Sequence, residues 1–310
     1  MFEIIFLGTS ASAPSVHRGL TSQVVMHAEH RFLIDAGEGT QRQILKSGLG
    51  FKRLDRILVT HGHLDHILGL GGLLSTFVRW EAMDEIEIVG GEAALGRIRD
   101  LLFGVVLKGK YPPVQIDFRA LEPGLVYEED DFSVTAFPVD HRTPGCFGYT
   151  FEEKSRRPFL PEKAQELEIP PGPWRRDLVE GQRVTLPDGR EIRPDQVLGE
   201  EVRGTKLVHV GDTGRTDNLL DQARGADALV IESTYLNSER ELAERFGHLT
   251  ARRAAELAVE AEVESLLLTH ISRRYREGDI IEEAREVFPK AWVCRDFDRF
   301  QIKRGECRKV

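Results

Sequence analysis

A short stretch around residue 60 carries four side chains that can bind a metal ion. Residues 60–66 are Thr-His-Gly-His-Leu-Asp-His and directly follow an apolar run. If that run is a strand, His61 and His63 leave its end on the same side, because side chains along a strand alternate with period two. Leucines at helical spacing follow the stretch, which predicts a helix that begins near Asp65 and His66. The donor atoms of these two residues would then point back toward the two histidines.

The side chains of this stretch combine imidazole nitrogen with carboxylate oxygen, a set that suits zinc, with manganese or iron as substitutes. A polar helix start that binds no metal is the other interpretation, because Asp is favoured in the first helical turn. That interpretation accounts for one His and one Asp, but not for three His and one Asp at alternating and adjacent spacing. Because six neighbouring positions cannot complete two coordination spheres, we expect further ligands elsewhere in the chain.

Further His, Asp and Glu residues follow apolar runs in the second half of the chain. Asp212, Glu232 and His270 each follow a run that is typical of a buried strand, as His61 does, and His141 follows another. Strands with helical segments between them indicate a layered α/β architecture, in which functional sites collect at strand ends. The sequence therefore predicts one shared site, with seven candidate ligands: His61, His63, Asp65, His66, His141, Asp212 and His270.

Asp35 also follows an apolar run and has two interpretations. It could orient a ligand histidine by accepting a hydrogen bond from its ring, or it could be a turn residue before Gly37, and the local sequence favours neither. The seven candidate ligands suit two metal ions that share one carboxylate. Two ions about 3.5–4 Å apart can activate a water at neutral pH and hold the oxygens of a phosphoryl or acyl centre. The predicted chemistry is therefore hydrolysis.

Composition and charge set limits on the class of protein. The 310 residues are 41% hydrophobic, enough for one large core or two modest ones. A net charge of −9 argues against a general polyanion binder, so any nucleic acid would have to meet local basic patches. The three widely spaced cysteines form no CxxC pair, which suits a reducing cytosol. With neither a signal peptide nor a run of bilayer-spanning length, we expect a soluble cytoplasmic protein without a membrane partner.

The chain is expected to alternate between short strands and helices, apart from one insertion. Residues 152–199 are mostly polar, contain Pro-Pro-Gly-Pro at 170–173, and are too long for an ordinary connection in a compact domain. They suggest a projecting element, and a solvated insertion without a ligand is the alternative. The other predicted elements are strands at 2–7, 24–26, 32–34, 86–89, 115–120, 124–127 and 132–137 and a helix near 92–103.

Several of these motifs resemble those of the metallo-β-lactamase superfamily. The match rests on residues 61–66, His141, residues 211–213 and His270. The resemblance implies an αββα sandwich, a subclass of α/β fold, in which residues 1–310 form a single domain with an inserted projecting arm.

More narrowly, the chain is similar to the ribonuclease Z family, whose members remove the 3′ trailer from precursor tRNA. This match rests on residues 35–43, on Glu232 with the His-Leu-Thr at 248–250, and on residues 268–275. It covers essentially the whole chain in order, and residues 152–199 lie where the family carries a flexible arm that binds tRNA. The resemblance implies a zinc-dependent endoribonuclease that leaves a 3′-hydroxyl on the tRNA and forms a homodimer.

The resemblance also implies a role for each site residue. Two zinc ions per subunit, or manganese or another divalent metal, would share Asp212. Asp65 would also orient or deprotonate the attacking water, and His248, held by Glu232, would protonate the leaving 3′ oxygen. Thr250 would cap the helix that follows. One ion would be bound by His61, His63 and His141, and the other by Asp65, His66 and His270.

The expected RNA contacts are less specific than the metal ligands. They are the basic residues of the arm, of the loop at 14–19 and of the segment after His270. The loop at 14–19 departs from the family's Pro-x-Lys-x-Arg-Asn, because Lys and Asn are missing, so discrimination against CCA-containing substrates is in question. The expected contacts are Arg18, Arg156, Arg157, Lys163, Arg175, Arg176, Arg273 and Arg274.

Three alternatives remain open at the level of sequence. Glu232 and His248 could form a surface pair without a catalytic role. A hydrolase of the same superfamily that acts on small esters or phosphodiesters would need neither this pair nor the insertion. A non-catalytic binding protein with a vestigial site would be expected to have lost some ligands, whereas every expected ligand type is present.

Overall fold

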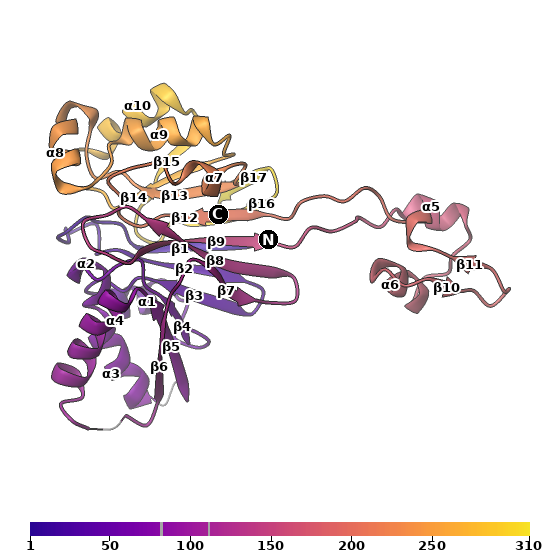
Figure 1. Ribbon diagram of the computed structural model, residues 1–310, viewed down its shortest axis with the longest axis horizontal. Helices are drawn as coiled ribbons and strands as arrows, with labels where there is room; N and C mark the ends of the chain where they lie inside the picture. Colours follow the sequence, from indigo (N-terminus) through magenta and orange to yellow (C-terminus); the bar gives the residue numbers. More distant parts are fainter. Residues whose placement is uncertain (81–82, 111) are drawn as a thin grey trace. The chain divides into compact units, whose positions relative to one another are not determined.

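The computed structural model describes residues 1–80, 83–110 and 112–310. The chain divides into two compact units (Figure 1). The first comprises Met1–Glu152 and Thr205–Val310, and the second comprises Glu153–Gly204. The second unit is therefore an insertion in the sequence of the first.

The first sheet of the larger unit has eight strands in the order β17-β16-β1-β2-β3-β4-β5-β6. Strands β3 to β6 run parallel to one another, whereas β1 pairs antiparallel with both β2 and β16. The strands are β1 (Phe2–Gly8), β2 (Ser22–His27), β3 (His30–Ile34), β4 (Arg56–Leu58), β5 (Glu85–Gly90), β6 (Gln115–Ala120), β16 (Arg299–Lys303) and β17 (Glu306–Lys309).

The second sheet has seven strands in the order β15-β14-β13-β12-β9-β8-β7. Strands β12 to β15 are parallel, so their carboxyl ends lie along the same edge. The strands are β7 (Gly124–Glu128), β8 (Phe132–Val139), β9 (Cys146–Glu153), β12 (Lys206–His209), β13 (Ala228–Glu232), β14 (Leu266–Thr269) and β15 (Ala291–Val293).

Helices cover the outer face of each sheet, so the two sheets lie between two helical layers (Figure 1). The predicted αββα sandwich is confirmed. The helices beside the first sheet are α1 (Thr40–Lys46), α2 (Leu64–Ile67), α3 (Leu70–Trp80), α4 (Glu92–Arg99) and the π-helix η1 (Asp100–Val106). Those beside the second are α7 (Leu220–Ala223), the 3₁₀ turn η3 (Asn237–Glu239), α8 (Arg240–Phe246), α9 (Ala251–Glu260) and α10 (Glu277–Val287).

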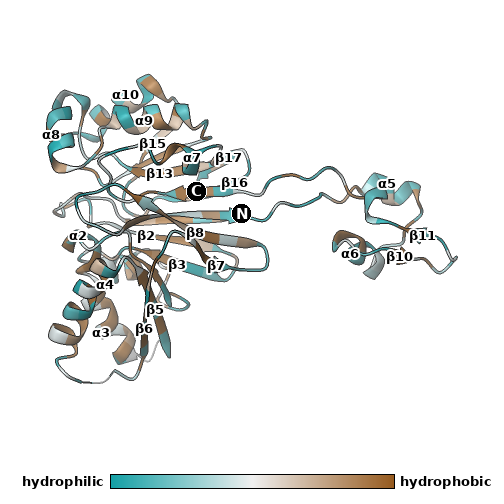
Figure 2. Cartoon of the chain, viewed as in Figure 1, coloured by the Kyte–Doolittle hydropathy of each residue, from teal (hydrophilic) through white to brown (hydrophobic). Residues whose placement is uncertain are grey.

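Both faces of the central strands are buried, as β1 illustrates. Phe2 and Phe6 enter the core between the two sheets, whereas Ile5 and Leu7 pack under the helices of the first layer. Since successive side chains point to opposite faces, a strand covered on both sides must be apolar at nearly every position. Brown stretches accordingly mark much of the central strands in the hydropathy view (Figure 2).

The smaller unit, which we call the arm unit, has a core of its own. Seven buried side chains, among them Leu178 and Ile192, pack between two short helices and a hairpin. Its elements are α5 (Pro161–Glu166), α6 (Pro173–Val179), β10 (Val184–Thr185), β11 (Glu191–Ile192) and the 3₁₀ turn η2 (Pro194–Gln196). In neither unit do the described residues form a helix of sufficient length and apolar character to cross a bilayer.

Candidate metal centre

The seven candidate ligands lie in loops that follow four strands and in the short helix α2, which contains Asp65 and His66, and they meet at one edge of the sandwich. His61 and His63 follow β4, and His63 is the N-cap of α2, with ψ of 151°. His141 follows β8, Asp212 follows β12 and His270 follows β14. Because parallel strands end at a common edge, ligands that are 200 residues apart in sequence become neighbours.

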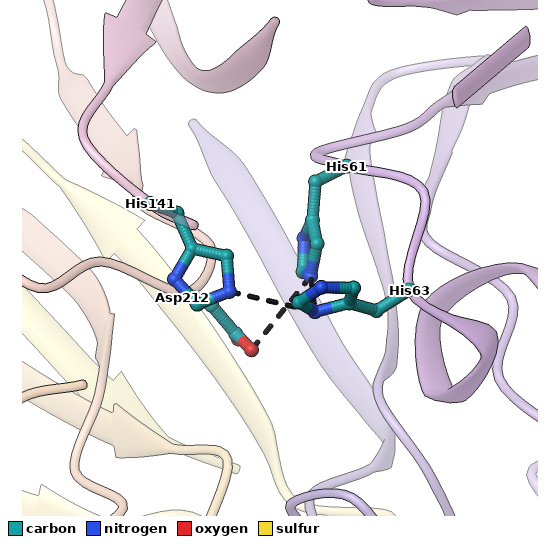
Figure 3. A group of neighbouring side chains, drawn as sticks. All are labelled: His61, His63, His141 and Asp212. Atoms are coloured by element: carbon teal, nitrogen blue, oxygen red, sulfur yellow. Dashed lines mark hydrogen bonds and ion pairs between the residues drawn. The ribbon is translucent and has the colours of Figure 1, made fainter. Parts of the chain in front are cut away.

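The first group of ligand atoms consists of three imidazoles and one carboxylate (Figure 3). His61 Nε2 lies 2.9 Å from His63 Nδ1 and 3.8 Å from Asp212 Oδ2. His141 Nε2 lies 3.4 Å from His63 Nδ1. The four ligand atoms all lie within 4.8 Å of one another, which is the spacing expected around a single ion.

The second group consists of Asp65, His66 and His270, whose ligand atoms also lie within 4.8 Å of one another. His270 Nε2 is 3.4 Å from Asp65 Oδ2 and 3.3 Å from Asp212 Oδ2. His66 Nε2 is 3.4 Å from Asp212 Oδ1. The carboxylate of Asp212 therefore lies between the two groups.

Protonation in the first group favours cation binding. Burial, together with the neighbouring His66, lowers the pKa of His61 well below its usual value, and burial also lowers the pKa of His63. Burial alone would raise the pKa of Asp212, but the surrounding histidines, His270 foremost, lower it well below its usual value. Neutral imidazoles around an ionised carboxylate are the states that metal ligands must adopt.

The surroundings of His66 show whether the second ligand group fits a cation. Its side chain is fully buried, and Nε2 makes no hydrogen bond although it lies near both Asp65 and Asp212. Burial should lower the pKa of His66, but the carboxylates of Asp212 and Asp35 outweigh burial and raise it well above its usual value. A buried nitrogen without a partner between two carboxylates is a position that a bound cation would satisfy.

Asp35 holds the ring of His66 from the other side. Its Oδ2 accepts hydrogen bonds from His66 Nδ1 and Thr60 Oγ1, each at 2.7 Å, and its Oδ1 accepts one from the Thr60 amide at 2.8 Å. The end of α2 is fixed nearby, because Gly37 and Gly69 bring two backbone segments so close that a Cβ on Gly69 would lie 2.0 Å from the Gly37 carbonyl oxygen. Of the two interpretations of Asp35, the structure favours the orienting role.

Glu232 and His248 form a buried pair beside the ligand groups. His248 Nδ1 donates to Glu232 Oε1 at 2.8 Å, and Glu232 also accepts from the amides of Thr213 and Leu249 and from the hydroxyl of Thr234. Burial would lower the pKa of His248, but the Glu232 carboxylate outweighs it and raises this pKa to about 9. The side chains are 13% and 1% exposed, so the alternative of a surface pair is wrong.

The expected RNA contacts fall into two sets. In the first, the cationic group is already bonded within the chain. Arg18 is the clearest case, because its guanidinium is only 13% exposed and donates to Thr9 Oγ1, the Cys294 carbonyl and Glu277. It holds the loop after β1 to α10 and does not present a free cation to RNA, contrary to the prediction. Arg157, Arg175 and Arg274 are likewise bonded, to Asp195, the Ile169 carbonyl and Glu239.

In the second set, the side chains are exposed and make no hydrogen bond or ion pair within the described ranges. These residues are Arg156, Lys163 and Arg176 in the arm unit and Arg273 in the larger unit.

Three threonines that support the site were not predicted from the sequence. Thr60 bonds to Asp35, Thr213 donates its amide to Glu232, and Thr234 Oγ1 lies 2.9 Å from His270 Nδ1. The only signal for them was their position next to candidate residues. The carbonyl of Gly247, which accepts from His141 Nδ1 at 2.8 Å, had no signal in the side-chain pattern at all.

Two family models match the chain. One, the metallo-beta-lactamase superfamily, matches residues 18–157, and the other, a beta-lactamase superfamily domain, matches residues 177–271. The chain is 44% identical over 302 residues to the ribonuclease Z of Bradyrhizobium diazoefficiens, covering 97% of this chain and 100% of the relative. It is 39% identical over 308 residues to the ribonuclease Z of Archaeoglobus fulgidus, covering 97% and 98%.

Solved structures share the whole fold. The short form of human tRNase Z is 25% identical, with a TM-score of 0.69 over 97% of this chain and 99% of that one. YhfI from Bacillus subtilis, a metallo-beta-lactamase fold protein, has a TM-score of 0.68 at 16% identity, which speaks to the fold alone.

Proposed function

The chain belongs to the ribonuclease Z family of the metallo-β-lactamase superfamily and is a metal-dependent endoribonuclease; on this premise we propose that it removes the 3′ trailer from precursor tRNA by hydrolysis with two zinc ions. The observation that carries the proposal is the position of Asp212. Its carboxylate lies between two ligand groups and 3.9 Å from His248 Nδ1, so both groups and the proposed proton donor converge on one point.

The proposed cofactor is a pair of zinc ions per subunit, which manganese or another divalent metal could replace. Bound together, such ions would activate a water and stabilise charge on the phosphoryl oxygens. Each ion would have three ligands of its own and Asp212 in common. His61, His63 and His141 would bind one, and Asp65, His66 and His270 the other.

Two side chains of the protein would move protons in the reaction. Asp65 would orient the attacking water and accept its proton; its Oδ2 is held by the Ser12 amide at 2.9 Å, and its pKa lies well below the usual value because contacts with His270 and His66 outweigh burial. His248 would protonate the leaving 3′ oxygen through Nε2, since Nδ1 is bonded to Glu232. Water oxygen then bonds to phosphorus as the P–O3′ bond breaks, giving a tRNA 3′-hydroxyl and a 5′-phosphate on the trailer.

The arm unit is the proposed exosite for tRNA. Arg156, Lys163 and Arg176 are exposed there without an internal partner. Arg156 also lines a hollow of about 930 Å³ together with three further arginines, Arg157, Arg183 and Arg193. Phosphate contacts of this kind give salt-dependent affinity without sequence specificity.

We further propose a homodimer in the cytoplasm. Large apolar side chains are exposed on the helices beside the first sheet, including Leu64, Leu68, Phe103 and Val105. A dimer that buried these side chains would be stabilised by their removal from water. Sedimentation velocity should show a species of twice the 35.0 kDa chain mass, and a single monomer peak at micromolar concentration would contradict the dimer.

Cleavage of two precursor tRNAs, one with an encoded CCA and one without, tests the reaction. The wild type should cut near the 3′ end of the mature tRNA in a metal-dependent way, and Asp65→Ala should lose at least a hundredfold in rate because the water loses its orienting carboxylate. Mapping the product ends shows what the altered loop at 14–19 permits. Metal analysis should find two zinc ions per chain in the wild type and fewer in the variant.

No cleavage of either RNA by fully metallated protein, with hydrolysis of small esters or phosphodiesters intact, would favour the small-molecule hydrolase of the same superfamily. Protein that purifies and reconstitutes without any divalent metal would favour a vestigial site.

A further inference from the structure

An exposed aromatic ring lies near two arginines and is close in sequence to the proposed proton donor. Phe246, at the end of α8, is two residues before His248 and is 37% exposed. The guanidinium carbons of Arg142 and Arg245 lie 5.9 Å and 5.5 Å from the centroid of its ring. We call these three residues, Arg142, Arg245 and Phe246, the Arg-Phe-Arg rim.

The rim is fixed to the candidate metal centre by the backbone at Gly247. This residue has φ of +69°, and a Cβ on it would lie 2.8 Å from Arg142 Cγ and 3.6 Å from His141 Nδ1. The aliphatic part of Arg142 therefore lies directly on the Gly247 backbone, whose carbonyl also holds His141. Gly247 therefore connects Arg142 to His141, and it directly precedes His248 in the chain.

The charges of the rim have no counter-ion in the part of the chain that the structure describes. Neither Arg142 nor Arg245 makes a hydrogen bond or ion pair there, and both side chains are exposed. Arg273 also lacks a partner among the described residues, whereas four arginines between residues 215 and 253 are matched with carboxylates. They are Arg215 with Asp217, Arg240 with Glu244, Arg252 with Glu286 and Arg253 with Glu256.

Two unmatched cations beside one exposed ring suit a nucleotide, which offers a phosphate and a flat base. Bases stack on aromatic side chains and on guanidinium planes whatever their identity, and arginine also pairs with phosphate. A single exposed Phe or Arg would need no explanation. The combination of two arginines and one ring, connected through Gly247 to His141 and His248, does need one.

We propose that the Arg-Phe-Arg rim binds the nucleotide on the 5′ side of the scissile bond, which becomes the 3′ end of the mature tRNA. This inference rests on the proposed function. His248 protonates the 3′ oxygen of that nucleotide, so its ribose must lie at His248, and its base comes within reach of Phe246. Arg142 neutralises the phosphate that precedes it. The rim thereby helps to select the bond that is cut.

The first test compares kcat/KM for precursor tRNA with kcat/KM for bis(p-nitrophenyl) phosphate, a small diester without a base. Phe246→Ala should lower the ratio of the two about tenfold, as loss of one base stack does, and Phe246→Tyr should restore it to within about twofold. Arg142→Gln should make the salt dependence of precursor binding shallower by about 0.7 in log–log slope, the value for one contact to a single strand. Arg304→Gln, in the exposed turn between β16 and β17, is the matched control and should change neither.

The second test assigns the contact to one nucleotide. A precursor with an abasic site 5′ of the scissile bond should already have lost the stack, so Phe246→Ala should cost it less than twofold. With an abasic site at the first trailer nucleotide, Phe246→Ala should still lower kcat/KM about tenfold. Loss of the trailer base and loss of the Phe246 ring are then independent effects.

The role of the rim would be overturned if Phe246→Ala lowered kcat/KM about tenfold with both abasic substrates. It would also be overturned if Phe246→Ala lowered kcat/KM for the small diester as much as for precursor tRNA. A wild type that cuts no precursor tRNA would instead overturn the proposed function. Metal content equal to wild type in each variant shows that the centre itself is intact.

Discussion

His209 is a buried histidine that is not one of the candidate metal ligands, and its burial affects the stability of the fold. It ends β12 and is 1% exposed; its Nε2 donates to Gln23 Oε1 at 3.2 Å, and its Nδ1 has no hydrogen bond. Burial lowers its pKa from 6.5 to about 4, because the charged imidazolium would lose its hydration between the sheets.

The folded protein should therefore lose stability in mild acid through His209. Between pH 6.5 and 4 the unfolded chain binds a proton at this residue more readily than the folded chain does, so this contribution is intact above pH 6.5 and is lost as the pH falls. From pH 7 to pH 5 the loss from this residue is about 2 kcal/mol. His209→Gln cannot take up the proton, and its free energy of unfolding should fall by about 2 kcal/mol less than that of wild type.

Urea denaturation at the two pH values, with chelator present throughout, measures this difference. His17→Gln, which removes an exposed imidazole, is the matched control and should follow the wild type. Equal losses in wild type and His209→Gln would show that the acid sensitivity comes from the other histidines.

For individual residues, the sequence predicted which side chains come together at the site, but not which hydrogen bonds hold each side chain in place. The seven candidate ligands and Glu232 could be located because each follows an apolar run, and parallel strands end at a common edge. Arg18 was misassigned because its partners, Glu277 and the Cys294 carbonyl, lie more than 250 residues away in sequence. The residues next to Arg18 in the sequence do not indicate a contact so distant along the chain. An arginine that is bonded within the protein therefore cannot be distinguished, from the motif, from one that binds RNA.

The helix after the proton donor is set by one capping residue. Thr250 Oγ1 accepts a hydrogen bond from the Arg253 amide at 3.1 Å, as the sequence predicted, and begins α9. The apolar stripe of this helix, including Leu257, is fully buried against the second sheet. Because His248 lies two residues before the cap, the start of α9 also sets where His248 can lie.

Removal of the cap should destabilise the protein without a change in packing. Thr250→Ala leaves one helical amide without its acceptor and should lower the free energy of unfolding by about 1 kcal/mol. Thr250→Ser keeps the hydroxyl and should lower it by less than half as much. Urea unfolding of the three proteins at one metal concentration decides this, and equal losses in the two variants would mean that the methyl group matters more than the cap.

Strand pairing was predictable only where neighbours in sequence are neighbours in a sheet. The predicted pair at 24–26 and 32–34 is confirmed as β2 and β3, with Val24 opposite Leu33. The predicted run of strands from residue 115 onward is instead divided, because β6 joins the first sheet beside β5 while β7 and β8 join the second. The predicted helix near 92–103 is α4 followed by a π-helix to Val106, for which the residue pattern gives no reason.

For the molecule as a whole, the net charge makes the arm unit the expected source of the salt dependence of tRNA binding. The chain carries a net charge of −9, so RNA must be attracted by local cations. Reversal of the three exposed residues without an internal partner, Arg156→Glu, Lys163→Glu and Arg176→Glu, should lower kcat/KM for precursor tRNA at least tenfold relative to bis(p-nitrophenyl) phosphate. The slope of log Kd against log salt should also become shallower.

A matched control reverses one arginine of the arm unit that is bonded to a neighbouring carboxylate and lies outside the hollow, Arg190→Glu, and is compared with the single change Arg176→Glu. Each of these two single substitutions changes the charge by the same amount, but Arg190→Glu removes no free cation, so its effect on precursor tRNA should be several times smaller than that of Arg176→Glu. If the first set of changes slows the small diester as much as the tRNA, the arm has a structural role and does not bind RNA.

The pairing of β1 with β16 has a consequence for how the enzyme is made. Residues 2–5 need residues 299–302 as partners on one side, and the ligands of the second group span residues 65–270. Most of the polypeptide must therefore be synthesised before β1 can pair with β16 or the second ligand group can assemble. Contacts so distant in sequence form slowly. We expect nascent chains to remain inactive and dependent on chaperones until synthesis is nearly finished, so that no truncated translation product can cut RNA.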